Sequence, residues 1–465
     1  MQTTKQNTHP FNLGKYIIFP TNLGKGTFGE VFLAKDKKGT MLAAKCISNK
    51  KIFSSNDSTQ KIINEISLYS KLKHRNIIKL KDVLLTQDET YLILEHCNCE
   101  NLQEFQSKYK EVFKHNPTMK VTQIIFTQII EGLYYMSTEK CIHRDLKLDN
   151  IMLSENQSLN MSININDKKI ESYFLQSDII KEKIDNNLYF DIPQMHPKYW
   201  DNEFISDENT FENHLKNYVI KIIDLGLGKR FSNEIETTSV CGNLVGISPE
   251  IWKILQKESQ TYSGDKVDLW SLGIILYHFA FKELPFKGEN WIQLSLLYEN
   301  GTYTVPNVNE NPITVEFLDL LSGLLRIDPQ QRYKWDTVKN HPFIRKPIDK
   351  QKIFKFENSN ALTLDITNNS QQFLSQEELN EYCDYVEDNP SQPSDEDNIQ
   401  NVEFRKYLIE IFKYKKHIIV PMETTITPID DEWSLLDNKV IESPKEQKKS
   451  FIGKIFSYLS SYHNQ

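Results

Sequence analysis

Cysteine is scarce and scattered in this sequence, with six residues in a chain of 465, and only Cys97 and Cys99 stand close together. This pair lacks the C-x-x-C spacing of metal-binding and redox motifs, and no second pair accompanies it. The spacing therefore argues against a disulfide-stapled secreted scaffold and against a zinc site. We expect free thiols in a reducing compartment.

Long apolar runs and an excess of basic charge are also missing. No run approaches the ~18 apolar residues of a transmembrane helix, and the first ten residues lack the apolar core of a secretory signal. The formal net charge of −8 argues against nucleic acid as a partner. Hydrophobic residues make up 39% of the chain, enough for one or two buried cores. We expect a globular protein of the cytoplasm, with the nucleus as the alternative.

One polar stretch is present that suggests chemistry: residues 143–150 read His-Arg-Asp-Leu-Lys-Leu-Asp-Asn. Residues 119–137 before it have the apolar spacing of a helix, and residues 151–153 after it are apolar like a short buried strand. A loop held between two such elements keeps its side chains at defined positions. Phosphoryl transfer uses these residue types: an Asp accepts a hydroxyl proton, a Lys neutralises charge, and an Asn with another Asp holds a metal. The alternative is a capped, salt-bridged loop without chemistry.

Further segments favour the catalytic interpretation. Residues 24–31 form a G-x-G-x-x-G-x-V run followed by strand-like alternation, which argues against a dinucleotide-binding unit, where a helix would follow. Lys45 stands in a strand-like segment, and Glu65 lies in a helical apolar pattern 20 residues later. The series then continues with Asp224-Leu225-Gly226, Ser248-Pro249-Glu250, residues 268–273 and Arg332.

On these motifs, in this order, the chain resembles the eukaryotic protein kinase family from about Tyr16 to Ile344. The resemblance implies an α+β, bilobal fold: a β-rich N-lobe at 16–95 with one main helix, and a larger helical C-lobe at 96–344. It also implies an ATP-dependent kinase that uses Mg²⁺ and acts on protein substrates. Lys147, two residues after Asp145, is typical of the serine/threonine-specific members. A narrower likeness to autophagy-initiating or calcium/calmodulin-dependent-type kinases is weaker.

The resemblance assigns roles to individual residues. Asp145, with Lys147 beside it, would orient and deprotonate the substrate hydroxyl. Lys45, paired with Glu65, would hold the ATP phosphates. Mg²⁺ would be coordinated by Asn150 and Asp224. The residues expected at the nucleotide are Leu23, Gly24, Lys25, Gly26, Thr27, Phe28, Gly29, Val31, Ala43, Lys45, Met152, and the backbones of Glu95 and Cys97.

Three supporting features are also implied by the resemblance. Glu250 and Arg332 would form a buried ion pair in the C-lobe. Asp268 would anchor the catalytic loop. Leu94 would be the gatekeeper residue next to the adenine.

Two positions depart from the family pattern and leave an alternative function open. Asn243 stands where the family has a Thr that bridges the catalytic Asp and Lys, and Gly246 stands where it has an aromatic residue. The alternative is a pseudokinase scaffold that binds ATP and partners with little transfer. For an active kinase, we expect phosphorylation at Thr237, Thr238 or Ser239 to order the activation segment through Arg144.

The remaining segments carry no recognised motif. We expect a disordered lead-in at 1–15 and, at about 154–217, an acidic insertion with twelve acids and six bases that loops out of the domain. The tail, 345–465, is expected to be partly disordered, with helices near 402–414 and 448–462. The second helix is basic and amphipathic; docking on protein is favoured over membrane contact. Within the C-lobe we expect a fully buried helix at 267–281 and an amphipathic helix at 317–325.

Overall fold

The computed structural model of the chain describes residues 10–26, 29–52, 54–86, 88–155, 200, 205, 207–230, 236–237, 247–255, 262–288, 291–307, 312–348, 352–356, 361–367 and 373. Among these residues, no helix combines the length and the apolar character needed to cross a membrane.

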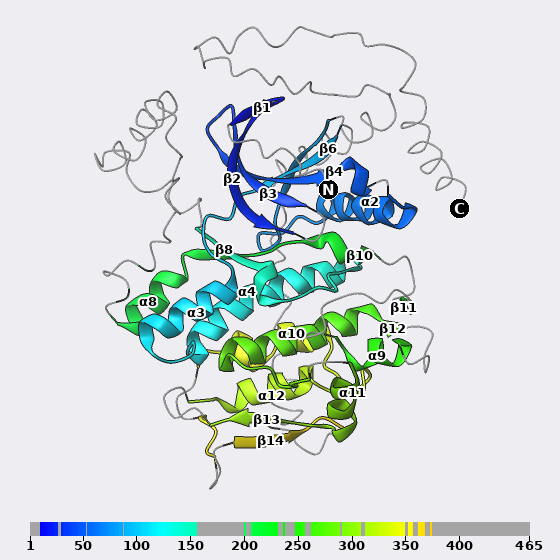
Figure 1. Cartoon of the computed structure of the whole chain (residues 1–465). Coiled ribbons are helices and arrows are strands. Elements are labelled where there is room, and N and C mark those ends of the chain that lie inside the picture. The colour runs from blue at the N-terminus through cyan, green and yellow to red at the C-terminus, as the bar shows by residue number, and fades with distance from the viewer. Residues whose placement is uncertain are drawn as a thin grey trace, which may run out of the picture. The chain divides into compact units, whose positions relative to one another are not determined.

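The N-lobe is a six-stranded antiparallel sheet with two helices inserted between its fourth and fifth strands (Figure 1). The strand order is β1-β2-β3-β4-β6-β5. The elements are β1 (Phe11–Leu13), β2 (Tyr16–Lys25), β3 (Glu30–Asp36), β4 (Met41–Ser48), α1 (Asn49–Ile52), α2 (Asn56–Lys71), β5 (Leu80–Leu85) and β6 (Glu89–Glu95). The predicted β-rich N-lobe with one main helix is therefore confirmed.

The strand β1 corrects the expectation of a disordered lead-in at 1–15 for its second part, residues 10–15, whereas residues 1–9 lie outside the described residues. Phe11–Leu13 pairs with β2, and Leu13 is buried in one hydrophobic cluster with Tyr16 and Ile18. Three residues that pair with a neighbouring strand and bury a leucine are ordered by those contacts, although their sequence carries no clear strand pattern.

The C-lobe is mostly helical. Its helices are α3 (Leu102–Phe113), α4 (Met119–Thr138), α8 (Glu208–Leu215), α9 (Pro249–Leu255), α10 (Gly264–Phe281), α11 (Trp291–Asn300), α12 (Val315–Leu324), α13 (Trp335–Lys339) and α14 (Pro342–Arg345). Side chains cap several of them: Asn101 and Glu104 form a capping box on α3, and Thr118 caps α4.

Short strands and turns connect these helices. They are β7 (Cys141–Ile142), η1 (Leu148–Asn150), β8 (Ile151–Glu155), β9 (Tyr218–Ile222), η3 (Leu225–Leu227), β10 (Lys229–Arg230), β11 (Glu236–Thr237), β12 (Tyr262–Ser263), β13 (Thr302–Pro306) and β14 (Ala361–Asp365). The antiparallel pairs are β8 with β9, β7 with β10, β11 with β12, and β13 with β14.

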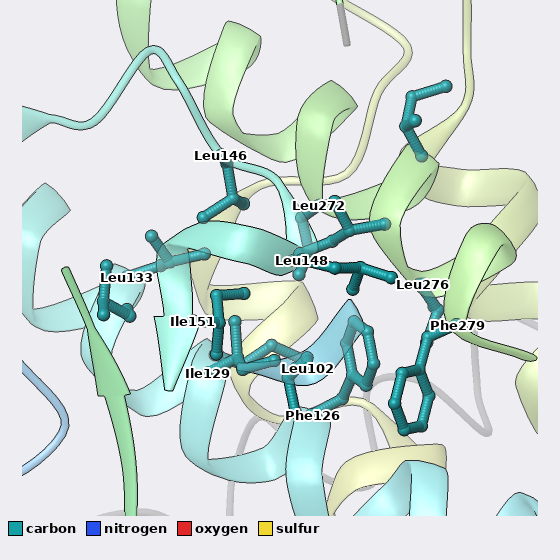
Figure 2. Packing of buried hydrophobic residues seen from close by; sticks show 14 of the residues in the cluster. Leu102, Phe126, Ile129, Leu133, Leu146, Leu148, Ile151, Leu272, Leu276 and Phe279 are labelled. Atoms are coloured by element: carbon teal, nitrogen blue, oxygen red, sulfur yellow. The ribbon is translucent and has the colours of Figure 1, made fainter. Parts of the chain in front are cut away.

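Helix α10 crosses the centre of the C-lobe core, as predicted for a helix that is apolar on all faces. All but two of its residues are buried. Figure 2 shows how the core continues into the polar loop between β7 and β8, because Leu146 and Leu148 of that loop join the same cluster. The other residues labelled there are Leu102, Phe126, Ile129, Leu133, Ile151, Leu272, Leu276 and Phe279. Leu146 and Leu148 therefore anchor the loop that carries the polar motif in the hydrophobic core.

The ends of the 154–217 segment are part of the folded domain, which corrects the prediction that the whole segment loops out. Ser154 pairs with Val219 in the ladder of β8 and β9. Helix α8, although it belongs to the acidic segment, buries Phe211 and Leu215, and Trp200 is buried as well. These apolar side chains complete the core beside α3 and α4, so composition alone misplaced the boundaries. Residues 156–199 lie outside the described part of the chain.

The amphipathic helix predicted at 317–325 appears as α12, and the structure buries its polar residues as well as its apolar ones. Even Glu316 and Asp319 are buried. Part of the cover comes from the tail: Lys352 pairs with Glu316 at 3.7 Å, and the backbone N–H of Phe373 donates to Asp319 at 3.1 Å. The side chains of Tyr333 and His341 also contact Asp319. The two predicted tail helices, at 402–414 and 448–462, lie outside the described residues.

Candidate active site

The backbone of the loop between β7 and β8 is held by α10. Asp268 of α10 accepts from the backbone N–H groups of His143 at 2.7 Å and Arg144 at 2.9 Å. Arg144 has a left-handed backbone with φ of 66°, which is costly for a residue with a side chain. The two bonds to Asp268 hold this unfavourable turn in place, which confirms the predicted anchoring role of Asp268.

His143 connects this loop to the strand that leads to Asp224. Its Nδ1 accepts from the backbone N–H of Asp145 at 3.3 Å, so Nε2 carries the proton that reaches the carbonyl of Ile223 at 3.0 Å. Ile223 in turn donates its N–H to the carbonyl of Asn150 at 2.9 Å. The two predicted clusters, around Asp145 and around Asp224, are therefore joined through Ile223, the residue between β9 and Asp224.

The carboxylate of Asp145 is buried and fixed by two neighbours. Lys147 Nζ lies 3.1 Å from Asp145 Oδ2, and Asn150 Nδ2 donates to the same oxygen at 3.1 Å. Asn150 also donates to the carbonyl of Asp145 at 2.8 Å. Because its amide nitrogen is used in this way, the amide oxygen is the Asn150 atom suited to bind a cation.

Lys45 is the centre of the second cluster. Its Nζ lies 2.7 Å from Glu65 Oε1 and 3.1 Å from Asp224 Oδ1. Burial disfavours a charged lysine, but the carboxylates of Glu65 and Asp224 outweigh it and raise the pKa of Lys45 above its usual range. A fully charged ammonium held between two carboxylates can bind phosphate oxygens without first being oriented.

Asp224 and Asn150 form a donor set that fits Mg²⁺. Burial opposes the charged form of Asp224, but Lys45 outweighs it and lowers the pKa of the Asp224 carboxyl below its usual range. Asp224 also has a left-handed backbone, with φ of 57°, and its Oδ1 accepts from the N–H of Gly226 at 3.4 Å. A carboxylate and an amide oxygen are hard ligands of the kind that Mg²⁺ takes together with phosphate.

The glycine-rich turn between β2 and β3 brings backbone close to this site. The N–H of Gly26 donates to the carbonyl of Gly29 at 2.8 Å. A Cβ on Gly29 would lie 1.8 Å from the carbonyl oxygen of Cys46, so only glycine fits there. A Cβ on Gly26 would lie 3.7 Å from Lys45 Cε, which places the turn beside the lysine.

The other predicted nucleotide contacts lie on the neighbouring strands. Val31 pairs opposite Lys45, and Ala43 pairs opposite the predicted gatekeeper Leu94. Met152 of β8 bridges to Asn101. Leu23 is 43% exposed, so its apolar side chain is accessible to an aromatic ligand.

Glu95 is the last residue of β6 and Cys97 lies two residues after it, so the two backbones predicted at the nucleotide stand at the end of this strand. The N–H of Glu95 donates to the carbonyl of Lys79 at 2.8 Å, and its side chain pairs with Lys221 at 2.7 Å. Burial raises the pKa of the Cys97 thiol to about 12, so this residue offers its backbone rather than a reactive thiolate.

The predicted ion pair of Glu250 and Arg332 is confirmed. It is bidentate, with distances of 2.6 Å and 3.1 Å, and the guanidinium stacks 5.1 Å from the ring centroid of Trp270. Arg332 also donates to the carbonyls of Lys266 and Arg326. The buried guanidinium of Arg332 thus has partners for its charge and its N–H groups. Because these partners include Glu250 of α9 and the carbonyl of Lys266 of α10, Arg332 fixes the position of α9 relative to α10.

Some predicted residues lie outside the described part of the chain. They are Thr27 and Phe28 of the glycine-rich turn, the departures Asn243 and Gly246, and the hydroxyl residues Thr238 and Ser239. The backbone of Thr237 pairs with Tyr262. Arg144 Nε donates to the carbonyl of Leu227 at 2.7 Å.

Sequence reasoning missed two residues near the site. Tyr69 stood in the helical pattern only as an apolar position, yet its hydroxyl accepts from the N–H of Leu225 at 3.3 Å. Trp200 belongs to the insertion that was predicted to loop out, yet its indole N–H donates to Glu100 at 2.5 Å, in the segment between β6 and α3. The only sequence signal for either was a large side chain in an otherwise ordinary segment.

Comparison with known proteins agrees with the resemblance found in the sequence motifs. The family model "Protein kinase domain" matches residues 19–168 and 202–344, together more than half of the chain. The chain is 27% identical over 335 residues to the probable serine/threonine-protein kinase MARK-A of Dictyostelium discoideum, covering 71% of this chain and 24% of that protein. It is 25% identical over 340 residues to NUAK family SNF1-like kinase 2 of Homo sapiens, covering 73% and 42%. It is 26% identical over 340 residues to the serine/threonine-protein kinase STK11 of Gallus gallus, covering 72% and 60%. The chain therefore spans less than two thirds of the length of these relatives.

Proposed function

The chain belongs to the protein kinase family, and from this premise we propose that it is an ATP-dependent serine/threonine protein kinase. It would transfer the γ-phosphoryl group of ATP to serine and threonine hydroxyls of protein substrates. The observation that carries this proposal is the pair of joined clusters, Lys45–Glu65–Asp224 and Asp145–Lys147–Asn150. The serine/threonine kinases among the relatives support the same activity.

The first cluster binds and orients the nucleotide. Lys45 is charged and held from two sides, so it can grip phosphate oxygens, and backbone N–H groups of the glycine-rich turn can approach the same phosphates. Asp224 and Asn150 would hold Mg²⁺, which when bound neutralises the charge that develops on the transferred group. This preorganisation is the main contribution that a protein makes to phosphoryl transfer.

The second cluster acts on the substrate hydroxyl. Asp145 carries an oxygen that can accept the hydroxyl proton, and the bonds from Lys147 and Asn150 fix the orientation of this carboxylate. Lys147 adds a positive charge next to the reacting groups, because its ammonium lies 3.1 Å from Asp145. A loop anchored to α10 keeps this arrangement in place when the substrate arrives.

The proposal is tested by Asp145→Asn. This variant keeps the size of the side chain and removes the base, so turnover on a generic serine/threonine peptide should fall by about 10²–10⁴. ATP affinity, measured by calorimetry, should stay within about twofold, because Asp145 has no assigned contact with the nucleotide.

A wild-type protein whose turnover equals that of Asp145→Asn would overturn the kinase proposal. If that protein still bound ATP tightly, the result would favour the alternative of a pseudokinase scaffold. That alternative rests on Asn243 and Gly246, whereas every charged side chain that the transfer requires is present at the site.

The cellular setting is also part of the proposal. We infer a cytoplasmic protein with protein substrates and without nucleic acid as a partner. The scarcity of cysteine and the net charge of −8 support this inference. Contact of the basic segment at 448–462 with a membrane is the less favoured arrangement.

A further inference from the structure

Tyr69 lies buried where α2 meets the turn that carries Asp224. It follows Glu65 by one helical turn, so both side chains lie on the same face of α2. Helix and turn are in direct contact: a Cβ on Gly228 would come within 2.6 Å of Leu68 Cδ1. Leu68 directly precedes Tyr69, so this end of α2 lies close to the residues that follow Asp224.

The hydroxyl of Tyr69 has one partner and one proton still to donate. It accepts from the backbone N–H of Leu225 at 3.3 Å, and a phenol that accepts one bond can also donate one. Tyr69 is only 4% exposed, so water is a poor candidate for that second bond. An unsatisfied buried hydroxyl would be costly.

Glu65 supplies the complementary acceptor. Its Oε1 is bound by Lys45, whereas its Oε2 is buried and, within the described residues, has no hydrogen-bond partner of normal geometry. Burial raises the pKa of Glu65, while Lys45 and the hydroxyl of Tyr69 both favour its charged form. Donation from Tyr69 to Oε2 would satisfy both buried groups at once.

We propose that Tyr69 is a positioning residue, whose hydroxyl joins Glu65 to the turn of Asp224 by donating to Glu65 Oε2 while accepting from Leu225. The proposal rests on the proposed kinase function and deepens it. Lys45, Glu65, Tyr69, Leu225 and Asp224 then form a closed ring of contacts. The ring orients the phosphate-binding lysine and the Mg²⁺-binding aspartate before nucleotide arrives.

The competing explanation is that Tyr69 only fills space in the core. A phenylalanine would then serve equally well, because its ring is the same size. Tyr69→Phe therefore separates the two explanations with a change that the fold should tolerate.

The first measurement is hydrogen exchange of nucleotide-free protein. In Tyr69→Phe, the amide of Leu225 should exchange at least about tenfold faster than in the wild type, because it loses its bond and the turn loosens. The second measurement is calorimetric binding of ATP with Mg²⁺, which should weaken at least about threefold. Neither readout requires turnover.

A double-mutant cycle tests whether Tyr69 acts through Glu65. In the background of Glu65→Ala, which removes the acceptor, Tyr69→Phe should change the affinity for ATP with Mg²⁺ by less than about 1.5-fold. An equal loss in both backgrounds would overturn the proposal, as would unchanged exchange and affinity in Tyr69→Phe alone.

Tyr277→Phe is the matched control. The hydroxyl of Tyr277 is partly buried and donates to the carbonyl of Thr304 at 2.7 Å in the C-lobe. Its loss should lower the melting temperature about as much as Tyr69→Phe does, without changing the exchange of Leu225 or the affinity for ATP with Mg²⁺. If wild-type turnover equals that of Asp145→Asn, the kinase proposal fails, and exchange and affinity still decide the role of Tyr69.

Discussion

His74 stacks on the ring of Tyr135 at a centroid distance of 5.1 Å, and its Nδ1 accepts from the backbone N–H of Asn76 at 3.2 Å. Burial, reinforced by the positive charges of Arg75 and Lys221, lowers the pKa of His74 from 6.5 to about 4. The folded state therefore takes up the His74 proton at lower pH than the unfolded chain does. The contribution of neutral His74 to the free energy of unfolding is therefore fully present above pH 6.5. It is lost as the pH falls from 6.5 to about 4, where the unfolded chain binds the proton more readily than the folded state.

His74→Gln should make the protein less sensitive to mild acid, because glutamine does not titrate. We expect the free energy of unfolding, measured with urea between pH 7.5 and 4.5, to fall less steeply in the variant than in the wild type. Absolute stability at pH 7.5 should be lower in the variant, because the stacking on Tyr135 is lost. Identical slopes in the two proteins would show that His74 does not titrate in this range.

Individual charged residues of the site were predictable, whereas their neutral partners were not. Lys45, Glu65 and Asp145 stand in motifs in which the residue type itself indicates chemistry. Tyr69 occupies a helical position where any large apolar residue would satisfy the pattern, and its hydroxyl gains a role only from Leu225, 156 residues away. Periodicity records which face a side chain occupies but not what its polar atom meets.

At the scale of elements, α8 is joined to the C-lobe by aromatic contacts. Phe211 is fully buried, with its ring centroid 5.2 Å from Trp200, 5.2 Å from Phe113 and 5.6 Å from Tyr109. Polar contacts add to these: Thr118 donates to Glu212 at 2.9 Å. The acids of α8 that made the segment look like a solvated insertion are thus used to attach it.

Phe211→Ala should therefore destabilise the protein by about 3–5 kcal/mol, the usual cost of a large cavity in a packed core. Urea unfolding would report this as a lower midpoint. Leu296→Ala is the control, because Leu296 is 53% exposed and its truncation should cost within about 0.5 kcal/mol. An unchanged midpoint for Phe211→Ala would mean that α8 is dispensable, as the composition of 154–217 first suggested.

Both buried helices of the C-lobe core were predicted from their apolar residues, whereas the contacts that distant segments make with them were not. The helix predicted at 267–281 appears as α10, because its apolar residues cover every face. The helix predicted at 317–325 appears as α12, but its polar face is covered by residues near 352 and 373. Sequence shows the polarity of a face but not what lies against it.

At the scale of the whole described molecule, two of the long-range connections show how segments far apart in the sequence are held together. One joins the lobes: the N–H of Ile222 donates to the carbonyl of Asn76 at 2.8 Å, and Asn76 Nδ2 donates to the carbonyl of Ile220 at 2.9 Å. The other is β14, which lies beyond the end of the family match at residue 344 and pairs along its whole length with β13. Both depend on partners too far apart in sequence for any local pattern to indicate.

The pairing of β14 extends the folded domain past the boundary that we predicted at 344. Leu364 and Ile366 are each only 1% exposed, and the N–H of Ile366 donates to the carbonyl of Gly301 at 2.7 Å. Arg326 donates to the carbonyl of Asp365 at 3.2 Å. The residues that follow the motif-bearing region thus complete its core.

A chain ending at residue 348 should therefore be less stable than one ending at residue 373. Removing the buried side chains of Leu364 and Ile366 alone costs about 3–6 kcal/mol, since each contributes about 1.5–3 kcal/mol.

Leu364→Ala tests the same contact in the full chain and should cost about 2–5 kcal/mol in urea unfolding. Thr363→Ala is its control, because Thr363 is exposed on the same strand and its loss should cost less than about 1 kcal/mol. If the two truncated chains unfold at the same urea concentration and Leu364→Ala behaves like Thr363→Ala, β14 adds nothing to the domain. If they differ as expected, the cooperative unit extends beyond the family match, because β14 pairs with β13 and residues of the tail contact α12.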